Sequence, residues 1–593
     1  MRIGSYSILL LLISLCFYSC SHPNRFDGQM GNGENQRLLP LVKLLPGHTR
    51  SDHEAVTKNY MITSQGKHAS LAGEKMFKMG GNAIDAAVAI SFVISVERPQ
   101  STGLGGGGFM LIHGPQMKQP VAVDFRESAP LASFQKMYQD KSGKVLKRKS
   151  IDGPLAAGVP GLVAGLLEIH QRWGKLPIKK VMAPAIKLAR EGFVVYPHLA
   201  KAIAKRQDVL KKYIGSKIIF LHPDNTPLTA GDTLVQRDLA KTLERISVEG
   251  KSAFYQGVIG NMIVAHQTKS GGLITQKDLS QYQVKYRQPV KGTYKGYKIY
   301  SMSPPSSGGV HIIQMLNMTE RLQLDTPLSA NTIHLVSSIM QMAYADRAKY
   351  LGDSDFQRVP VKGLISKQYA IDRLRYLGRK VHRSSAEVDY GNPLRYESDE
   401  TTHLTVMDKK GYVVTSTQTV NGYMGSGVVV PGTGILLNNE MDDFALSPGK
   451  PNQFGLVGFG VNAVGPGKRL LSSMTPTIAS RSGHVMALGT PGGSTIITNV
   501  FQVLTNRLRY DMTLDEAVAK KKLHAQGWPD FLFVEADALS PFTKLCLRLR
   551  GHELKTRSQI GRFEAVEMIQ SEARFHSSPD VSRQGDASGW PVP

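Results

Sequence analysis

The chain has 593 residues, of which 41% are hydrophobic and 20% are charged. This composition favours a globular protein over a disordered, fibrous or collagen-like one, and ~150 residues per domain would give three or four units or two large ones. Lys and Arg outnumber Asp and Glu by 72 to 47, a net charge of +25. Because the basic residues are scattered and form no single block, we expect no nucleic-acid partner.

Cysteine is rare in this sequence, which contains only Cys16, Cys20 and Cys546. So few cysteines exclude a disulfide-rich scaffold and a CxxC metal site. The 17 histidines show no metal-ligand spacing, so we expect no metal.

The N-terminus has the pattern of a signal peptide. A basic Arg2 precedes a mostly apolar run, residues 8–17, which is too short for the ~20 residues that span a bilayer. Because small Ser19 then precedes Cys20, we predict a lipoprotein signal over 1–20, with Cys20 lipidated and the protein held at a bacterial membrane, in the periplasm or at the cell surface. Ordinary secretion and an uncleaved anchor are the alternatives. Polar residues 21–55 are predicted to form a tether.

Helices and strands alternate in the next segment. The predicted elements are helices 71–79 and 83–94, a glycine-rich run 103–108, and strands 109–113 and 121–125. Gly103, Gly105 and Gly108 satisfy the GxGxxG spacing, but a dinucleotide loop follows a strand and opens a helix, and here the order is reversed. The glycines therefore indicate a tight turn with close backbone packing.

Helices dominate the middle of the chain and strands its last third. The predicted elements are helices 178–191 and 331–351, an aperiodic polar segment 379–400, and strands 403–408, 411–420, 432–438 and 484–490. With strands at both ends of the chain and no repeat between them, we expect one interwoven α/β domain.

Residues 401–420 read as a β-hairpin with a turn at Lys409, Lys410 and Gly411. If Asp408 pairs with Tyr412, then Thr401 lies opposite Thr419, and alternation places Thr415, Thr417 and Thr419 on one face. On spacing alone, the other interpretation is a threonine-rich strand without chemistry.

A set of motifs resolves this ambiguity. The sequence resembles the γ-glutamyltransferases (γ-glutamyltranspeptidases) of the N-terminal nucleophile hydrolase superfamily. The matching segments occur in family order and include GGNAIDAAVA (80–89), GLGGGGFM (103–110), DFRESAP (124–130), PPSSGG (304–309), YADRAKYLGD (344–353), NNEMDDF (438–444), NAVGPGKRLLSSMTPT (462–477) and GTPGGST (489–495).

The resemblance implies an α/β (α+β) fold, a four-layer αββα sandwich built jointly by two chains. These would come from a precursor that cuts itself between Glu400 and Thr401, giving a large chain, 56–400, and a small chain, 401–593. Thr401 would then be the nucleophile, because its freed α-amine can act as the adjacent base.

The resemblance also implies the remaining site residues. Thr419 would steady the nucleophile, and the N–H groups of Gly492 and Gly493 would form an oxyanion hole. The α-carboxylate of the substrate would contact Arg126, Ser472 and Ser473, and its ammonium would contact Asn421, Glu440 and Asp443. Phe454, in a lid segment 448–458, would cover the pocket.

The implied activity is cleavage of γ-glutamyl amides such as glutathione, with transfer of the glutamyl group to water, amino acids or peptides and without a cofactor. The implied partners are these small molecules, the other cleavage product and, through the lipid anchor only, a membrane. Two alternatives remain open: a cephalosporin (glutaryl) acylase-like hydrolase, and a catalytically inactive lipoprotein that binds peptides.

Overall fold

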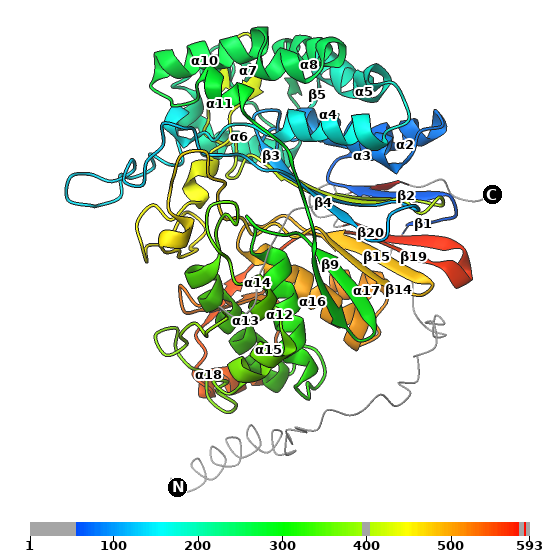
Figure 1. The fold of residues 1–593 in the computed structure, drawn as a ribbon, viewed down its shortest axis with the longest axis vertical. Helices are drawn as coiled ribbons and strands as arrows, with labels where there is room; N and C mark the ends of the chain where they lie inside the picture. Colours follow the sequence, from blue (N-terminus) through cyan, green and yellow to red (C-terminus); the bar gives the residue numbers. More distant parts are fainter. Residues whose placement is uncertain (1–54, 394–403, 580–585, 589–593) are drawn as a thin grey trace, which may run out of the picture.

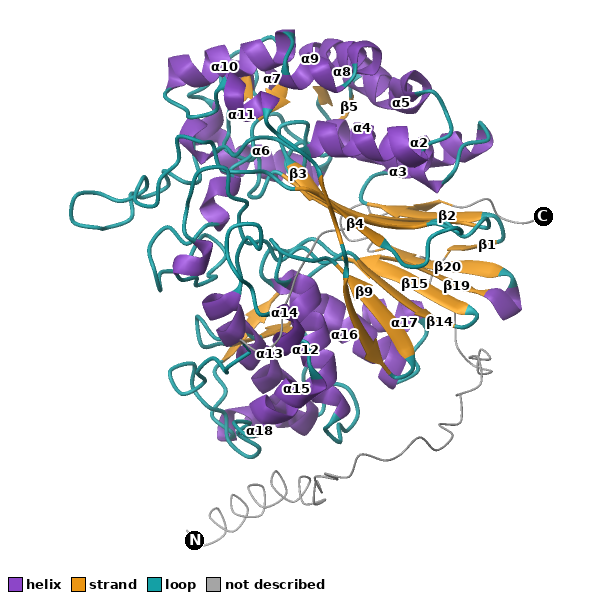
Figure 2. Ribbon diagram, in the orientation of Figure 1, coloured by secondary structure: helices purple, strands orange, loops and turns teal. Residues whose placement is uncertain are grey.

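The computed structural model describes residues 55–393, 404–579 and 586–588. Two seven-stranded antiparallel sheets are stacked face to face, and a layer of helices covers the outer side of each (Figures 1 and 2). This confirms the four-layer αββα fold. The predicted signal with Cys20, and the predicted tether up to residue 54, lie outside the described residues.

The two sheets are called sheet I and sheet II. In spatial order, sheet I contains β21 (Asp586–Ser588), β2 (Tyr60–Ser64), β10 (Leu404–Asp408), β11 (Val413–Thr419), β3 (Gly107–His113), β4 (Val121–Phe125) and β7 (Lys285–Arg287). Sheet II contains β1 (Ala55–Thr57), β20 (Arg574–Pro579), β19 (Glu564–Ile569), β15 (His484–Gly489), β14 (Thr477–Arg481), β9 (Tyr297–Ser301) and β8 (Val290–Tyr294).

The helices form two groups (Figure 1). The layer beside sheet I contains α2 (Lys67–Lys78), α3 (Ala83–Glu97), α4 (Leu162–Trp173), α5 (Ile178–Glu191), α6 (Pro197–Leu210), α7 (Ile214–Phe220), α8 (Arg237–Glu249), α9 (Lys251–Tyr255), α10 (Val258–Ser270) and α11 (Gln276–Ser280). The layer beside sheet II contains α12 (Gly308–Glu320), α13 (Ala330–Tyr350), α14 (Val361–Leu364), α15 (Lys367–Leu374), α16 (Thr495–Arg509), α17 (Leu514–Ala519) and α18 (Pro541–Leu549). Within the described ranges, no helix is both long and apolar enough to cross a membrane.

Short strands complete the fold. They form three small sheets, which pair β5 (Phe193–Val194) with β6 (Thr233–Leu234), β12 (Val429–Val430) with β13 (Ile435–Leu436), and β17 (Leu532–Glu535) with β16 (Leu523–His524) and β18 (Leu554–Arg557).

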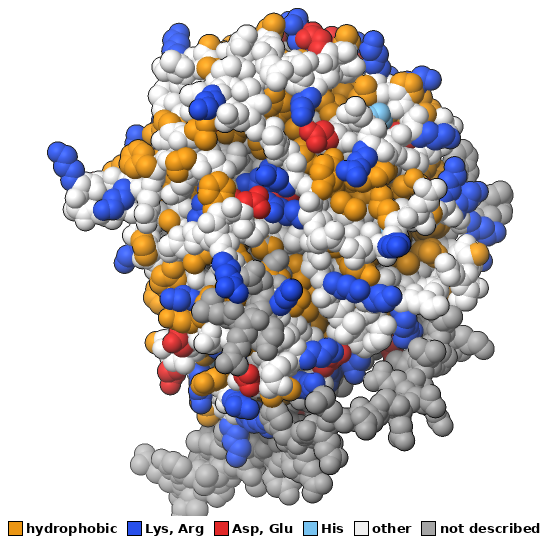
Figure 3. All heavy atoms as spheres, in the orientation of Figure 1, with side chains coloured by type: hydrophobic (Ala, Val, Ile, Leu, Met, Phe, Trp, Pro, Cys, Tyr) orange, Lys and Arg blue, Asp and Glu red, His pale blue; other side chains and the backbone are white. Residues whose placement is uncertain are grey.

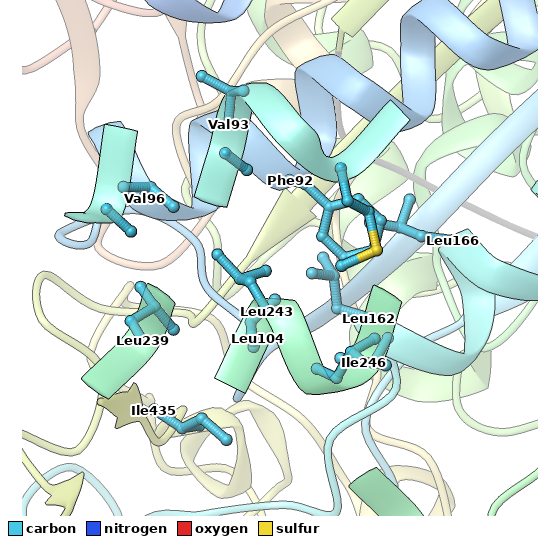
Figure 4. Close-up of a cluster of buried hydrophobic side chains, with 14 of the residues drawn as sticks. Phe92, Val93, Val96, Leu104, Leu162, Leu166, Leu239, Leu243, Ile246 and Ile435 are labelled. Carbon is cyan, nitrogen blue, oxygen red and sulfur yellow. The ribbon is translucent and has the colours of Figure 1, made fainter. Parts of the chain in front are cut away.

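The central helix of the first layer, α3, is apolar on nearly all sides because it is covered by other helices as well as by sheet I. A capping box between Asn82 and Asp85 satisfies the N–H groups of its first turn. Figure 4 shows side chains of this region, Phe92, Val93 and Val96, among apolar residues of neighbouring elements.

Alternation along the β10–β11 hairpin determines which side chains face the other sheet. Leu404, Val406 and Val414 belong to the core beneath the helices, whereas Met407 and Val413 belong to the core between the sheets. Thr405 and Thr415 share the inter-sheet side, with their hydroxyls 3.4 Å apart. By period two, Thr417 and Thr419 lie on this side as well.

Strands from the two sides of residue 400 are interleaved in both sheets. In sheet I, β10 pairs with β2 and β11 pairs with β3. In sheet II, β14 pairs with β9 and β20 pairs with β1. The expectation of one interwoven domain therefore agrees with the strand order.

The helices of the last third, α16 to α18, were not among the predicted elements. Polar residues obscure the apolar stripe of α16, and several of them, including Thr498, Asn499 and Gln502, are buried. Thr498 and Gln502 are satisfied locally, through bonds to backbone carbonyls. Their polarity is therefore compatible with a buried helix.

Candidate active site

A cavity of about 690 Å³ opens at the ends of the central strands of sheet I. Leu404, the first described residue after position 403, lies in its wall. The cavity is lined by nine of the predicted site residues, namely Arg126, Thr419, Asn421, Asp443, Phe454, Ser472, Ser473, Gly492 and Gly493.

The β10–β11 hairpin has the register predicted from the sequence. Leu404 pairs with Ser416 and Met407 with Val413. The turn closes with the Asp408 N–H donating to Tyr412 O at 3.1 Å, and Gly411 has a φ of +90°, which favours glycine. Glu400 and Thr401, the predicted cleavage site and nucleophile, lie outside the described residues.

Thr419 ends β11, where it pairs with Gly107. Its Oγ1 accepts a hydrogen bond of 2.6 Å from the N–H of Asn421, a residue with a φ of +74°. A Cβ on Gly106 would lie 2.2 Å from the carbonyl oxygen of Thr419. The glycine run therefore permits close backbone packing beside Thr419, as predicted, and is no dinucleotide loop.

Arg126 lies at the end of β4 with its guanidinium buried among three carboxylates. Its Nη1 is 2.8 Å from Glu440 Oε1 and its Nη2 is 2.7 Å from Glu440 Oε2, so the two side chains form a bidentate pair. Glu127 and Asp443 complete the group, at 3.1 and 3.3 Å from the guanidinium. Glu440 is fully buried and does not line the cavity, so it supports Arg126 from behind.

The charges in this cluster do not balance, since one guanidinium faces three carboxyl groups. Burial raises the pKa of Asp443 well above its usual range, and the charge of Glu440 raises it further. Burial also raises the pKa of Glu127 and Glu440, against the opposing charge of Arg126. Once the surplus carboxyl groups are ionised, the cluster attracts an additional cation, such as the ammonium of an amino acid.

Ser472 and Ser473 are held by two other segments. The N–H and Oγ of Ser307 donate to Ser472 O at 3.0 and 2.9 Å. Arg347 of α13 donates from Nη2 to Ser473 Oγ at 3.1 Å and from Nε to Ser307 Oγ at 2.8 Å. The two serines therefore depend on the PPSSGG and YADRAKYLGD segments.

Gly492 and Gly493 form the approach to α16. Their φ angles, +144° and +58°, are in the region that favours glycine. Their carbonyls accept from the N–H groups of Thr495 and Ile496, whereas neither glycine N–H donates a hydrogen bond to another described residue. Both N–H groups lie at the cavity and at the N-terminal end of a 15-residue helix, where the helix dipole favours negative charge.

The segment 448–458 folds over this glycine pair. A Cβ on Gly493 would lie 2.7 Å from Cδ1 of Phe454, so the ring rests on the glycine backbone. Asn452 Nδ2 is 3.4 Å from Asp443 Oδ1, and the Gln453 N–H donates to Asp442 Oδ2 at 3.1 Å. The segment predicted to form the lid is thus bonded to Asp443 and to its neighbour Asp442.

Three residues of the site were absent from the sequence prediction. These are Glu127, Arg347 and Asn439, whose carbonyl accepts from Asn421 Nδ2 at 3.0 Å. All three lie within the motifs that carried the family resemblance. Their position inside these motifs was the signal that could have identified them. The motifs do not show, however, which side chains are in contact.

Comparison with known proteins identifies the family of the chain. The gamma-glutamyltranspeptidase family model matches residues 69–590. The glutathione hydrolase proenzyme of Escherichia coli K12 is 41% identical over 89% of this chain and 91% of its own length. The Acylase ACY 1 proenzyme of Pseudomonas sp. SE83 is 36% identical over 83% of this chain and 87% of its own length.

A solved structure of similar fold is the cephalosporin acylase of Bacillus halodurans. It superposes with a TM-score of 0.80 over 93% of this chain and all of its own, at 24% identity, which supports the fold alone. With the family model and the 41% identical relative, the assignment is clear: this chain belongs to the γ-glutamyltranspeptidase family.

Proposed function

We propose that the protein is a self-processing enzyme that cleaves γ-glutamyl amides such as glutathione and transfers the γ-glutamyl group to water, amino acids or peptides. The observation that carries this proposal is the buried group of Arg126 with Asp443 beside the Gly492–Gly493 turn. Opposite charges at one end of a cavity suit a zwitterion, and free backbone N–H groups suit a developing oxyanion.

Maturation is a proposed acyl shift followed by hydrolysis. The Thr401 hydroxyl attacks the carbonyl carbon of Glu400, the peptide C–N bond breaks, and an ester forms while the nitrogen of Thr401 gains a proton. Water then opens the ester, which leaves a carboxylate on Glu400 and a free amine on Thr401. This amine becomes the base that a threonine hydroxyl needs.

Turnover repeats the same chemistry on the substrate. Thr401 Oγ attacks the γ-carbonyl, its proton passes to the departing amine, and a γ-glutamyl ester remains until water or an acceptor amine replaces it. The N–H groups of Gly492 and Gly493 stabilise the oxyanion in both steps, and one such donor is worth ~3–4 kcal/mol. Thr419 orients the hydroxyl, in accord with the hairpin register.

A second candidate is a glutaryl acylase, favoured by the 36% identity with an acylase proenzyme. A glutaryl group has no ammonium, so it gains nothing from surplus carboxylates. We therefore expect Asp443→Ala to weaken γ-glutamyl substrates far more than glutaryl ones. Equal losses on both would favour the acylase.

The decisive experiment compares the wild-type protein with Thr401→Ala. The wild type should separate into two fragments under denaturing electrophoresis, with Thr401 at the N-terminus of the smaller one, and should release p-nitroaniline from γ-glutamyl-p-nitroanilide. Thr401→Ala should stay whole and inactive. A wild-type chain that stays whole and turns over no amide would instead support an inactive binding protein.

We also propose that a lipoprotein signal is removed directly before Cys20 and that Cys20, the first residue after cleavage, carries a lipid. The support is the short apolar run before Cys20. Metabolic labelling with a radioactive fatty acid tests it, since label should be lost in Cys20→Ala and retained in Cys16→Ala.

A further inference from the structure

The lid segment 448–458 is held from behind by a buried side chain that does not line the cavity. Basic side chains are scattered over the face of the molecule in Figure 3, whereas this residue, Gln526, is uncharged and 8% exposed. Its Nε2 donates to Phe454 O at 3.3 Å and to Trp528 O at 2.7 Å. Gln526 therefore contacts the backbone of the same residue whose ring packs on Gly493.

The side-chain amide of Gln526 is restricted to one orientation. Both carbonyl oxygens are acceptors, so the NH2 group must face them and Oε1 must point away. Oε1 lies 2.8 Å from Nε2 of His524, which must therefore carry a proton to donate. Burial lowers the pKa of His524 to about 4, so the ring is neutral at neutral pH and its Nδ1 carries no proton. The direction of each hydrogen bond from His524 to Phe454 is thus determined.

His524 is held in place by the elements around it. Its Nδ1 lies 2.9 Å from the Thr498 hydroxyl, whose single proton is shared between this nitrogen and Thr495 O at 3.0 Å. The rings of Tyr344 and Phe533 pack against the imidazole, with centroids 5.8 and 6.2 Å away. Because Thr498 is part of α16, the bonds from His524 connect the lid to the helix that begins beside the glycine pair.

The part of the lid that carries Phe454 is a turn, residues 452–456, with hydrogen bonds of its own. Asn452 Oδ1 accepts from two N–H groups of this turn, at 3.0 and 3.1 Å. Its position therefore depends on contacts with the rest of the protein, which are the bonds to the acidic pair on one side and Gln526 on the other. A Cβ on Gly455 would lie 2.9 Å from Gln526 Nε2, so glycine permits this approach.

We propose that Gln526 is a positioning residue of the active site, a role that rests on the proposed function. Oriented by His524, it holds the backbone of Phe454 so that the ring stays over Gly493 and covers the glutamyl group. Without this bond the turn keeps its internal structure but loses one of its two attachments. The ring should then leave the glycine backbone more often.

The first test measures the position of the lid directly. Chymotrypsin cleaves after aromatic residues, so the bond between Phe454 and Gly455 is cut only when the turn opens. Gln526→Met keeps the length of the side chain but removes its donor and its acceptor. Cleavage of the native protein at this bond should become about fivefold faster, the effect of one lost hydrogen bond. The product is identified by an N-terminal sequence that begins at Gly455.

The second test separates binding from chemistry. For γ-glutamyl-p-nitroanilide, KM of Gln526→Met should rise about fivefold and kcat should change less than about twofold, because the lid covers ground state and transition state alike. In a Phe454→Ala background the same substitution should leave KM unchanged, since no ring remains to be positioned. A general loss of stability would instead lower kcat through the active fraction and leave KM as it is.

Gln236→Met is the matched control. Gln236 is 3% exposed and donates from Nε2 to Val96 O at 2.8 Å, so the substitution removes the same kind of buried bond outside the cavity and the lid. It should change neither the cleavage after Phe454 nor KM. His524→Phe, which removes the donor that orients Gln526, should change both in the same direction as Gln526→Met.

The outcomes separate the two proposals. Unchanged cleavage and KM in Gln526→Met and His524→Phe overturn the inference. Equal effects in Gln236→Met, or a loss confined to kcat, also overturn it, because they would assign Gln526 to general stability. A wild-type protein that cleaves no γ-glutamyl amide contradicts the proposed function instead, while chymotrypsin still tests the contact between Gln526 and the lid.

Discussion

At Gly493 the backbone has a φ of +58° and supports the ring of Phe454. Gly493 therefore has two roles, since it lies at the cavity with an N–H group that is free to donate, and the Phe454 ring packs against its backbone. Neither role leaves room for a Cβ. Substitutions of Gly493 should therefore affect both the catalytic rate and the packing of Phe454.

We predict that Gly493→Ala lowers kcat for γ-glutamyl-p-nitroanilide ~10²-fold, because the added Cβ displaces both the N–H donor and Phe454. Phe454→Ala removes the steric part of this conflict. The double variant should therefore lose less activity than the sum of the two single losses, expressed as free energies. Additive losses would show that lid and glycine act independently.

The charge imbalance around Arg126 predicts how affinity depends on pH. Burial, and then the charge of Glu440, raise the pKa of Asp443, so this carboxyl gains its negative charge only as the pH rises. The inhibition constant of L-glutamate should therefore fall about tenfold between about pH 6 and 8, because its ammonium needs the ionised carboxylate. Glutarate, which lacks an ammonium, should show no such improvement, and Asp443→Asn should flatten the glutamate profile.

At the scale of the element, the segment 382–391 before the proposed cleavage site is fastened to α13. Asp346 Oδ1 accepts from the N–H of Gly391 at 2.9 Å, and the Tyr350 hydroxyl donates to Gly391 O at 2.6 Å. A Cβ on Gly391 would lie 2.3 Å from the Tyr369 hydroxyl, so the contact needs glycine. The chain is thus fixed nine residues before Glu400.

We predict that Tyr350→Phe slows self-cleavage about fivefold, because the loss of one hydrogen bond worth ~1 kcal/mol loosens the segment. The ratio of precursor to fragments over time, read from a denaturing gel, measures this. Matured enzyme should keep its kcat. Tyr510→Phe, which removes a similar bond of 2.8 Å to Asp325 O, is the control and should mature at the wild-type rate. Equal slowing in both variants would assign the effect to general destabilisation.

Elements with a strong local pattern were predictable from the sequence. The hairpin register followed from one turn glycine and period two, and α5 has the predicted bounds, Ile178–Glu191. The bidentate contact between Arg126 and Glu440 joins residues 314 positions apart, and no local pattern encodes such a pairing. The order of strands in the two sheets likewise depends on pairings between residues that are far apart in the sequence. Family motifs named most of the cavity residues, whereas their contacts required the fold.

At the scale of the whole molecule, the two predicted fragments share both sheets. The contact between β11 and β3 alone pairs seven residues of one fragment with seven of the other. Backbone hydrogen bonds and the core between the sheets both cross this boundary. Cleavage between 400 and 401 should therefore leave the fold intact.

We predict that cleavage makes unfolding depend on protein concentration. Matured enzyme should elute as one species under native conditions, and its urea midpoint should rise with concentration, because its unfolded state is two separate chains. The midpoint of the uncut Thr401→Ala precursor should not change. If the two midpoints behave alike, the fragments are not held as the strand pairing indicates.

The interleaving of β2, β10, β11 and β3 also prevents the exchange of fragments between molecules. Neither fragment can dissociate without breaking the central strand pairs of sheet I. Two variants mixed in one solution should therefore not exchange fragments. An inactive small chain therefore cannot be rescued by an intact one made elsewhere. Each molecule retains for its lifetime the halves with which it was synthesised.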